Sequence, residues 1–220
     1  MDNPNLILLF VLIISYITGS FPTSIIMGKL VKKIDIRDHG SGNAGATNVF
    51  RVLGVKPALI VITIDIFKGW LPAFYFAKLF LKLTMIPDLG ILQILCGFSA
   101  VLGHTYTIFA NFKGGKGVGT LGGMLIAMFP IAVVLCISVF IITLILTGYV
   151  SVGSMIASAS LPIFILTLPL IGIEPAELSL MIFSLIVPFF VIYTHRSNLS
   201  RLRNGEENRF HKAMIFNKKT

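Results

Sequence analysis

Hydrophobic and polar positions follow one another along this chain in long blocks. Six apolar runs are visible, and each is about as long as a helix needs to be to cross a lipid bilayer. They cover residues 5–27, 57–81, 89–110, 118–147, 151–171 and 178–194. The pattern predicts an all-α, polytopic helical membrane protein without a separate soluble domain.

Two breaks interrupt these runs. The run 118–147 is longer than one span requires and contains Phe129-Pro130, where proline lacks the amide donor of a continuous helix. Splitting it there predicts about seven membrane segments, with a short half-span or re-entrant helix over 118–129, and five spans are the alternative. The stretch Gly19-Ser20-Phe21-Pro22 predicts a kink or an unwound turn. Gly115, Gly119 and Gly123 have the spacing of small residues that let helices pack closely.

Charge sets the expected orientation in the membrane. Of 18 Lys and Arg residues, six lie in 28–56, two in 111–117 and seven in 194–220. By the positive-inside rule these segments are cytoplasmic, which places the N-terminus outside and the C-terminus in the cytoplasm. Composition agrees with a membrane protein, with 55% hydrophobic and 12% charged residues and a mean hydropathy of +0.92. Cys96 and Cys136 have no second Cys or His at metal spacing, so neither a disulfide framework nor a zinc site is expected.

The first polar segment, residues 41–51, has the residue types of an anion-binding loop. Small residues favour a tight loop with inward-pointing amides, and Arg51 supplies a bidentate fork for phosphate. Ser41 and Asn43 are suited to bond phosphate or hydroxyl oxygens, whereas Thr47 or Asn48 would alternatively cap the next helix. A solvated turn is the other interpretation. The candidate binding residues are Ser41, Gly42, Asn43, Gly45, Thr47, Asn48 and Arg51.

The second polar segment combines glycines with two lysines. Glycines allow close backbone approach, and a helix N-terminus and lysine charges attract anions. It is not a nucleotide-binding P-loop, because Lys116 is followed by glycine and the segment lies between membrane helices. A loop that only sets topology is the alternative. The candidates are Lys113, Gly114, Gly115, Lys116 and Gly117.

The third segment follows the last apolar run. Helical spacing places His195, Asn198 and Arg201 along one face, where Arg201 would bind an anion and His195 would donate to phosphate or position a hydroxyl. A histidine facing lipid headgroups is the alternative. His39 and His211 are expected at the surface.

Two further residues form a second tier of candidates. Lys68 lies three residues after Asp65 inside an apolar run, which indicates a neutralised pair in the bundle interior, with a contact to the polar site as the alternative. His104 would either join that site or pack between helices.

In their order and spacing these segments resemble the PlsY family, the bacterial membrane glycerol-3-phosphate acyltransferases that use acyl-phosphate as donor. The resemblance covers nearly the whole chain and rests on Gly19-Ser20-x-Pro22, Ser41 to Arg51, Asp65-x-x-Lys68-Gly69, Gly103-His104, Phe109 to Val118, His195-x-x-Asn198-x-x-Arg201 and Gly205-x-Glu207.

The resemblance implies a single acyltransferase domain over residues 1–220, with cytoplasmic motif segments 28–56, 111–120 and 194–207. A fatty acyl group would pass from acyl-phosphate to the sn-1 hydroxyl of glycerol 3-phosphate, giving lysophosphatidic acid and phosphate, the first acylation of phospholipid synthesis. The chain would lie in the bacterial cytoplasmic (inner) membrane. Its partners would be these two substrates and membrane lipids, with no nucleic acid, metal or cofactor.

The residues suit this reaction by direct attack of the substrate hydroxyl. The chain has no His-x4-Asp and no Gly-x-Ser-x-Gly, so neither motif supports a base dyad or an acyl-serine intermediate. Ser41, Asn43, Lys116 and His195 are the candidate catalytic residues. We expect Arg51, Ser41, His195 and Asn198 to hold glycerol 3-phosphate, and the amides and lysines of 113–117 to hold the donor phosphate. A phosphate oxygen of the donor would accept the hydroxyl proton.

Three other classes of protein share parts of this pattern. A transporter of phosphate or a small organic anion would have basic and glycine-rich segments, although usually near the bilayer midplane. A lipid phosphotransferase would show an acidic metal cluster, and only scattered acids are present. A binder of anionic lipids would need only the basic tail.

Overall fold

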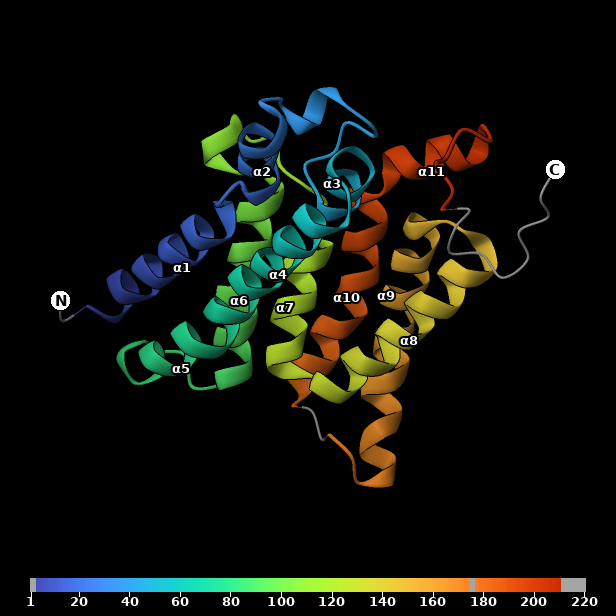
Figure 1. The fold of residues 1–220 in the computed structure, drawn as a ribbon. Coiled ribbons are helices and arrows are strands. Elements are labelled where there is room, and N and C mark those ends of the chain that lie inside the picture. The colour runs from blue at the N-terminus through green and yellow to red at the C-terminus, as the bar shows by residue number, and fades with distance from the viewer. Residues whose placement is uncertain (1–2, 175–176, 211–220) are drawn as a thin grey trace. The chain divides into compact units, whose positions relative to one another are not determined.

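The computed structural model describes residues 3–174 and 177–210, and within them every regular element is a helix (Figure 1). The all-α prediction is confirmed, and His211 lies outside the described residues. The helices form two compact units, Met1–Met128 and Phe129–Thr220. The single domain expected from the sequence stays a prediction.

The first unit is built on two helix pairs. Helix α1 packs against α6, and α4 packs against α7 (Figure 1). The elements in chain order are α1 Pro4–Ser20, α2 Thr23–Lys32, η1 Ile36–Asp38, α3 Ala46–Leu53, α4 Val55–Leu71, the π-helical turn η2 Pro72–Phe76, α5 Ala77–Phe80, η3 Leu81–Leu83, α6 Leu89–Thr105, η4 Ile108–Ala110 and α7 Val118–Met128.

Glycines bring the paired helices into backbone contact. A Cβ built at Gly69 of α4 would lie 1.9 Å from the Thr120 carbonyl oxygen of α7, and one at Gly123 would lie 1.9 Å from the Ile66 carbonyl oxygen. Gly119 faces the side chain of Asp65 in the same seam. The close packing predicted for Gly119 and Gly123 is therefore confirmed. Gly115 lies before α7 and takes no part in that seam.

Both predicted breaks are present. Helix α1 ends at Ser20 and α2 begins at Thr23, so Phe21 and Pro22 form an unwound turn. Helix α7 ends at Met128 and α8 begins at Pro130, where a proline at the first helical position needs no amide donor.

The second unit contains α8 Pro130–Thr147, α9 Val150–Thr167, η5 Leu168–Ile171, α10 Leu178–Thr194 and α11 Arg196–Arg203. Helix α9 packs against both α8 and α10. The Glu174 carboxylate accepts hydrogen bonds from the amides of Ile131 and Ala132, each 2.8 Å long. It thereby satisfies two free donors at the positive end of α8.

Five helical segments of the described residues are long and apolar enough to cross a membrane: Pro4–Lys32, Val55–Leu83, Leu89–Ala110, Pro130–Thr147 and Val150–Ile171. Helix α10 with α11, bent by 59°, makes a sixth candidate, and α7 is a shorter apolar helix. The chain is thus a multi-pass membrane protein. The seven predicted segments correspond to these five, α10 and α7, while the number of full crossings and the sidedness stay predictions.

Candidate functional site

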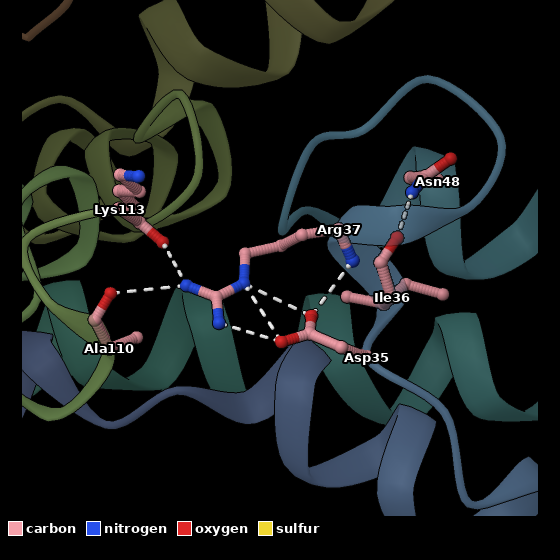
Figure 2. A network of polar contacts seen from close by, with 6 residues as sticks. All are labelled: Asp35, Ile36, Arg37, Asn48, Ala110 and Lys113. Atoms are coloured by element: carbon pink, nitrogen blue, oxygen red, sulfur yellow. Dashed lines mark hydrogen bonds and ion pairs between the residues drawn. The ribbon is translucent and has the colours of Figure 1, made fainter.

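Asn48 shapes the first polar segment. Its side chain is buried, and its Oδ1 accepts a 2.8 Å hydrogen bond from the Ser41 amide. Its Nδ2 donates to the carbonyl oxygens of Ile36 and His39, at 2.9 Å each (Figure 2 shows the first). The amide group is therefore used to fold the loop before α3. The N-cap of α3 is Gly45 without a side-chain hydrogen bond, so the alternative of a cap by Thr47 or Asn48 is wrong.

The other candidates of this segment lie nearer the surface. Gly42 is exposed and has a φ of 72°, in the left-handed region that favours glycine. The half-buried residues are Ser41, Asn43, Gly45, Thr47 and Arg51, the last of these in the final turn of α3. This arrangement places a hydroxyl, an amide and a guanidinium on one short loop and helix.

The backbone of the second segment is turned inward at its first three residues. The amides of Lys113, Gly114 and Gly115 donate to the carbonyl oxygens of Ala110, Thr105 and His104, at 3.1, 3.1 and 3.2 Å. The expectation that these three amides hold a phosphate is therefore wrong, because protein carbonyls already accept their hydrogen bonds.

The amides without an acceptor inside a helix lie further along this segment. The first intrahelical bond of α7 runs from the Leu121 amide to the Gly117 carbonyl oxygen, at 2.7 Å. The three amides of Val118 to Thr120 therefore have no acceptor within the helix and stand at its positive end. Lys116 is half-buried beside them, and Gly117 has a φ of 79° at the turn into the helix. Lys113 is exposed.

The structure brings the first and second segments together. Ala44 and Ala110 belong to one buried cluster with Ile36 and Val49. The Arg37 guanidinium donates from Nη1 to the carbonyl oxygens of Ala110 and Lys113, at 3.1 and 3.4 Å (Figure 2). One polar surface of the first unit therefore carries both segments.

A buried ion pair lies near these segments. Lys68 Nζ is 2.8 Å from Asp65 Oδ1, and the two side chains are 5% and 3% exposed. Lys68 also donates to the Phe21 carbonyl oxygen at 2.9 Å, and the Thr23 hydroxyl donates to Asp65 at 3.1 Å. The interpretation as a structural pair is confirmed, because the two charges neutralise each other and also bond residues at the unwound turn between α1 and α2.

His104 lies between this pair and the second segment. Its Nδ1 is 3.7 Å from Asp65 Oδ1, and a Cβ built at Gly115 would lie 2.1 Å from its Nε2. A pocket there has a volume of about 10 Å³, near the minimum for one water molecule and too small for a phosphate ester. Lys68 and His104 therefore lie beneath the polar segments. The pocket's polar lining side chains are Thr23, Ser24, Asp65, Lys68, His104 and Thr107.

The third segment lies at the bend between α10 and α11. His195 is 4% exposed, and its Nδ1 lies 2.8 Å from the Val191 carbonyl oxygen. Because a carbonyl oxygen only accepts, Nδ1 carries the proton, and in the neutral ring Nε2 is the acceptor. His195 is thus suited to accept a hydrogen bond from a hydroxyl group.

Glu207 collects the other donors of this segment. Its Oε1 accepts from Asn198 Nδ2 at 2.6 Å and from the Ser151 hydroxyl at 2.8 Å, and its Oε2 accepts from Arg201 Nε at 2.8 Å. Burial alone would raise the pKa of Glu207, but the hydrogen bonds from Asn198, Ser151 and Arg201, together with the arginine charge, lower it overall. Two residues expected to face an anionic substrate therefore also hold an anion of the protein itself.

Comparison with known proteins decides the family. The family model described as "Glycerol-3-phosphate acyltransferase" matches residues 9–205. The chain belongs to the glycerol-3-phosphate acyltransferase family. A relative of that name from Pelodictyon phaeoclathratiforme is 43% identical over 93% of this chain and 97% of its own length. Another, from Chlorobium limicola, is 44% identical over 93% and 97%.

Solved structures agree with this glycerol-3-phosphate acyltransferase assignment. The crystal structure of PlsY (YgiH), an integral membrane glycerol 3-phosphate acyltransferase in its glycerol 3-phosphate form, has a TM-score of 0.79 and 35% identity over 92% of this chain and 95% of that one. The lysophosphatidic acid form has a TM-score of 0.77 and 34% identity over the same shares. The resemblance to the PlsY family is confirmed.

Two groups of this acyltransferase were missed from the sequence. Asp35 and Arg37 look like ordinary basic-loop residues, although the close Asp-x-Arg spacing permits a local pair. The sequence does not show the contacts of Glu207, although Gly205, with a φ of 74°, marks the turn that returns it to α11. In residues 3–174 and 177–210, no three His, Cys, Asp or Glu side chains are grouped closely enough to hold a metal ion.

Proposed function

We propose that this protein transfers a fatty acyl group from acyl-phosphate to the sn-1 hydroxyl of glycerol 3-phosphate, giving lysophosphatidic acid and phosphate. The observation that carries the proposal is the match over 92% of the chain to crystal structures of PlsY in its glycerol 3-phosphate and lysophosphatidic acid forms. These two molecules differ by one acyl group on one hydroxyl, which supports acyl transfer to that hydroxyl.

The first unit supplies groups for binding phosphate. Lys116 and the three amides at the start of α7 would hold the phosphate of the donor, where full and partial positive charges stabilise the departing phosphate. Arg51 on α3 would bind the phosphate of glycerol 3-phosphate as a bidentate fork. Ser41 and Asn43 would bond oxygens of the substrates.

The chemistry then needs little more than positioning. The sn-1 hydroxyl oxygen attacks the acyl carbonyl carbon, the bond from that carbon to the phosphate oxygen breaks, and a phosphate oxygen takes the hydroxyl proton. His195 would orient a substrate hydroxyl through its Nε2 acceptor. Acyl-phosphate carries its own activation, so we propose a reaction without cofactor or metal.

Donor preference tests this proposal. Purified protein would be incubated with labelled glycerol 3-phosphate and, in parallel, palmitoyl-phosphate, palmitoyl-CoA or palmitoyl acyl-carrier-protein. We expect labelled lysophosphatidic acid with palmitoyl-phosphate, lost in Lys116→Ala and kept in Lys33→Gln, which removes an exposed lysine of the segment 28–56. Folded protein that makes no product with any donor would contradict the proposal and favour an anion transporter.

Two variants separate the roles within the reaction. Arg51→Ala should chiefly raise the half-saturating concentration of glycerol 3-phosphate, and an unchanged value would remove that assignment. His195→Ala should lower activity without removing an ionisation near neutral pH from the rate profile. Loss of such an ionisation would make His195 a general base.

We further propose the bacterial cytoplasmic membrane as its location, with the motif segments 28–56, 111–120 and 194–207 facing the cytoplasm. Single cysteines at exposed positions such as Lys33 and Arg203 should resist an impermeant thiol reagent in intact cells and react in inverted vesicles. Labelling in intact cells would reverse the orientation.

A further inference from the structure

Arg37 lies in the short helix η1, and Asp35 is the residue just before that helix. The Asp35 carboxylate accepts hydrogen bonds from Arg37 Nε at 3.0 and 3.1 Å, from Nη2 at 2.6 Å and from the Arg37 amide at 2.9 Å (Figure 2). About a quarter of each side chain is exposed. The hydrogen bond from Arg37 is the main reason why the pKa of Asp35 is lowered. The guanidinium is therefore held in one orientation by a charged, bidentate partner.

The remaining edge of that guanidinium faces the second polar segment. Nη1 donates to the carbonyl oxygens of Ala110 and Lys113, at 3.1 and 3.4 Å (Figure 2). These carbonyls flank Asn111 and Phe112, whose φ angles are 54° and 57°. Two successive residues with side chains in the left-handed region are unfavourable and need support from their surroundings.

Burial of side chains does not supply that support. Asn111, Phe112 and Lys113 are all exposed, so packing of their side chains contributes little to holding the turn. Hydrogen bonds hold it: Phe112 donates to the Thr107 carbonyl oxygen at 2.9 Å, Lys113 donates to that of Ala110, and Arg37 joins both ends of the turn from outside. Of these contacts, the one from Arg37 links the turn to η1, and Asn48 of the first polar segment bonds the Ile36 carbonyl oxygen of the same short helix.

We propose that Asp35 and Arg37 form a positioning pair that holds the segment 110–117 in the conformation that presents Lys116 and the start of α7 to the donor phosphate. The proposal rests on the function proposed above for that segment. Four of the five N–H donors of Arg37 bond Asp35 and two carbonyl oxygens, so we assign it a positioning role and not a binding one. The pair would couple the geometry of the first segment to that of the second.

Hydrogen exchange tests the pair without using activity. The amides of Lys113, Gly114 and Gly115 are bonded to carbonyl oxygens, so their exchange reports opening of the turn. In full-length detergent-solubilised protein, we expect Arg37→Gln to speed exchange of peptides covering 110–117 about tenfold. Asp35→Asn, which keeps the arginine but weakens its anchor, should act in the same direction. Lys33→Gln is the charge-matched control and should leave exchange unchanged.

Kinetics then separates positioning from folding. Arg37→Gln should raise the half-saturating concentration of palmitoyl-phosphate about tenfold while that of glycerol 3-phosphate stays within about twofold. Arg37→Lys should restore only part of the loss, because one ammonium cannot replace the planar fork.

The outcomes distinguish the two proposals. Unchanged exchange in both Arg37→Gln and Asp35→Asn overturns the positioning pair, even where the wild-type protein makes lysophosphatidic acid. Faster exchange with equal effects on both substrates also overturns it, since the turn would then serve the fold in general. If the two variants exchange faster but the wild-type protein makes no product with any donor, the pair still holds the turn and the proposed function is removed.

Discussion

Two adjacent glycines of α7 offer a sharp test of the helix seam in the first unit. A Cβ built at Gly123 would lie 1.9 Å from the carbonyl oxygen, 2.7 Å from the carbonyl carbon and 3.0 Å from the Cα of Ile66 in α4. A Cβ built at its neighbour Gly122 would have no atom within 4 Å. The variants Gly123→Ala and Gly122→Ala therefore add the same methyl group to the same helix in opposite surroundings.

The magnitudes follow from these distances. Real Cβ atoms essentially never approach within 3.0 Å of another atom, so α4 and α7 must separate by about 1 Å at Gly123. The contacted atoms are backbone and cannot rotate away, and a gap of this size forfeits a quarter to a half of each dispersion contact along the seam. We expect Gly123→Ala to cost about 2–3 kcal/mol, the upper part of the range for overpacking. Gly122→Ala should gain about 0.5–1 kcal/mol from helix propensity.

Thermal unfolding in one detergent at one scan rate measures the difference. The midpoint for Gly123→Ala should fall by roughly 4–12 °C, and that for Gly122→Ala should stay level or rise slightly. Equal midpoints for the two variants would refute the close seam between α4 and α7. Because α7 begins at the segment proposed to bind phosphate, Gly123→Ala should also lower activity at temperatures where it is still folded.

Lys68, Glu207 and Asn48 each give a further prediction. Lys68→Met strands the buried Asp65 carboxylate and should cost about 3–5 kcal/mol, whereas Asp65→Leu with Lys68→Met should cost less than the sum of the single changes; additive costs in detergent denaturation would argue against coupling. The pKa of Glu207 is lowered, so its stabilisation is present above the ordinary carboxyl pKa of about 4.3 and is lost as pH falls through the lower folded value. Hydrogen exchange in α11 should therefore quicken only below about pH 4, and Glu207→Gln should show faster exchange at neutral pH as well; a wild-type transition near pH 6 would contradict this. Asn48→Ala removes three hydrogen bonds of a buried side chain and should destabilise by roughly 2–4 kcal/mol, with a raised half-saturating glycerol 3-phosphate concentration; unchanged kinetics would separate the loop from substrate binding.

The sequence was sufficient to predict the helices because their causes are local. The long apolar runs form the helices, and the dipeptides Phe21-Pro22 and Phe129-Pro130 interrupt them only locally. Helices α1 and α7 therefore end just before these two dipeptides. The pairing of Asp65 with Lys68 was likewise readable from their spacing along one helix.

The side-chain partners were harder to predict, because they join positions far apart in the chain. Asn48 is a residue type that often binds ligands, but its partners are backbone groups of residues 36, 39 and 41. Asn198 and Arg201 lie near one another as predicted, yet the carboxylate they bond comes from Glu207 beyond the helix. A polar side chain in a motif can serve a ligand or the loop that holds a ligand, and spacing alone does not separate the two.

In the second segment, the hydrogen-bond partners of the backbone amides help to separate a ligand-binding role from a structural one. Four glycines beside two lysines suggest amides that cradle phosphate, but Cβ atoms at Gly114 and Gly115 would lie 1.9 Å from the His104 carbonyl oxygen and 2.1 Å from His104 Nε2. These two glycines let the segment lie directly on the end of α6, and their amides are spent there. The proposed phosphate-binding groups are therefore Lys116 and the amides that have no acceptor within α7. A large side chain at Gly115 should therefore harm the enzyme by lifting the segment off α6, and moving Lys116 with it, rather than by blocking a phosphate.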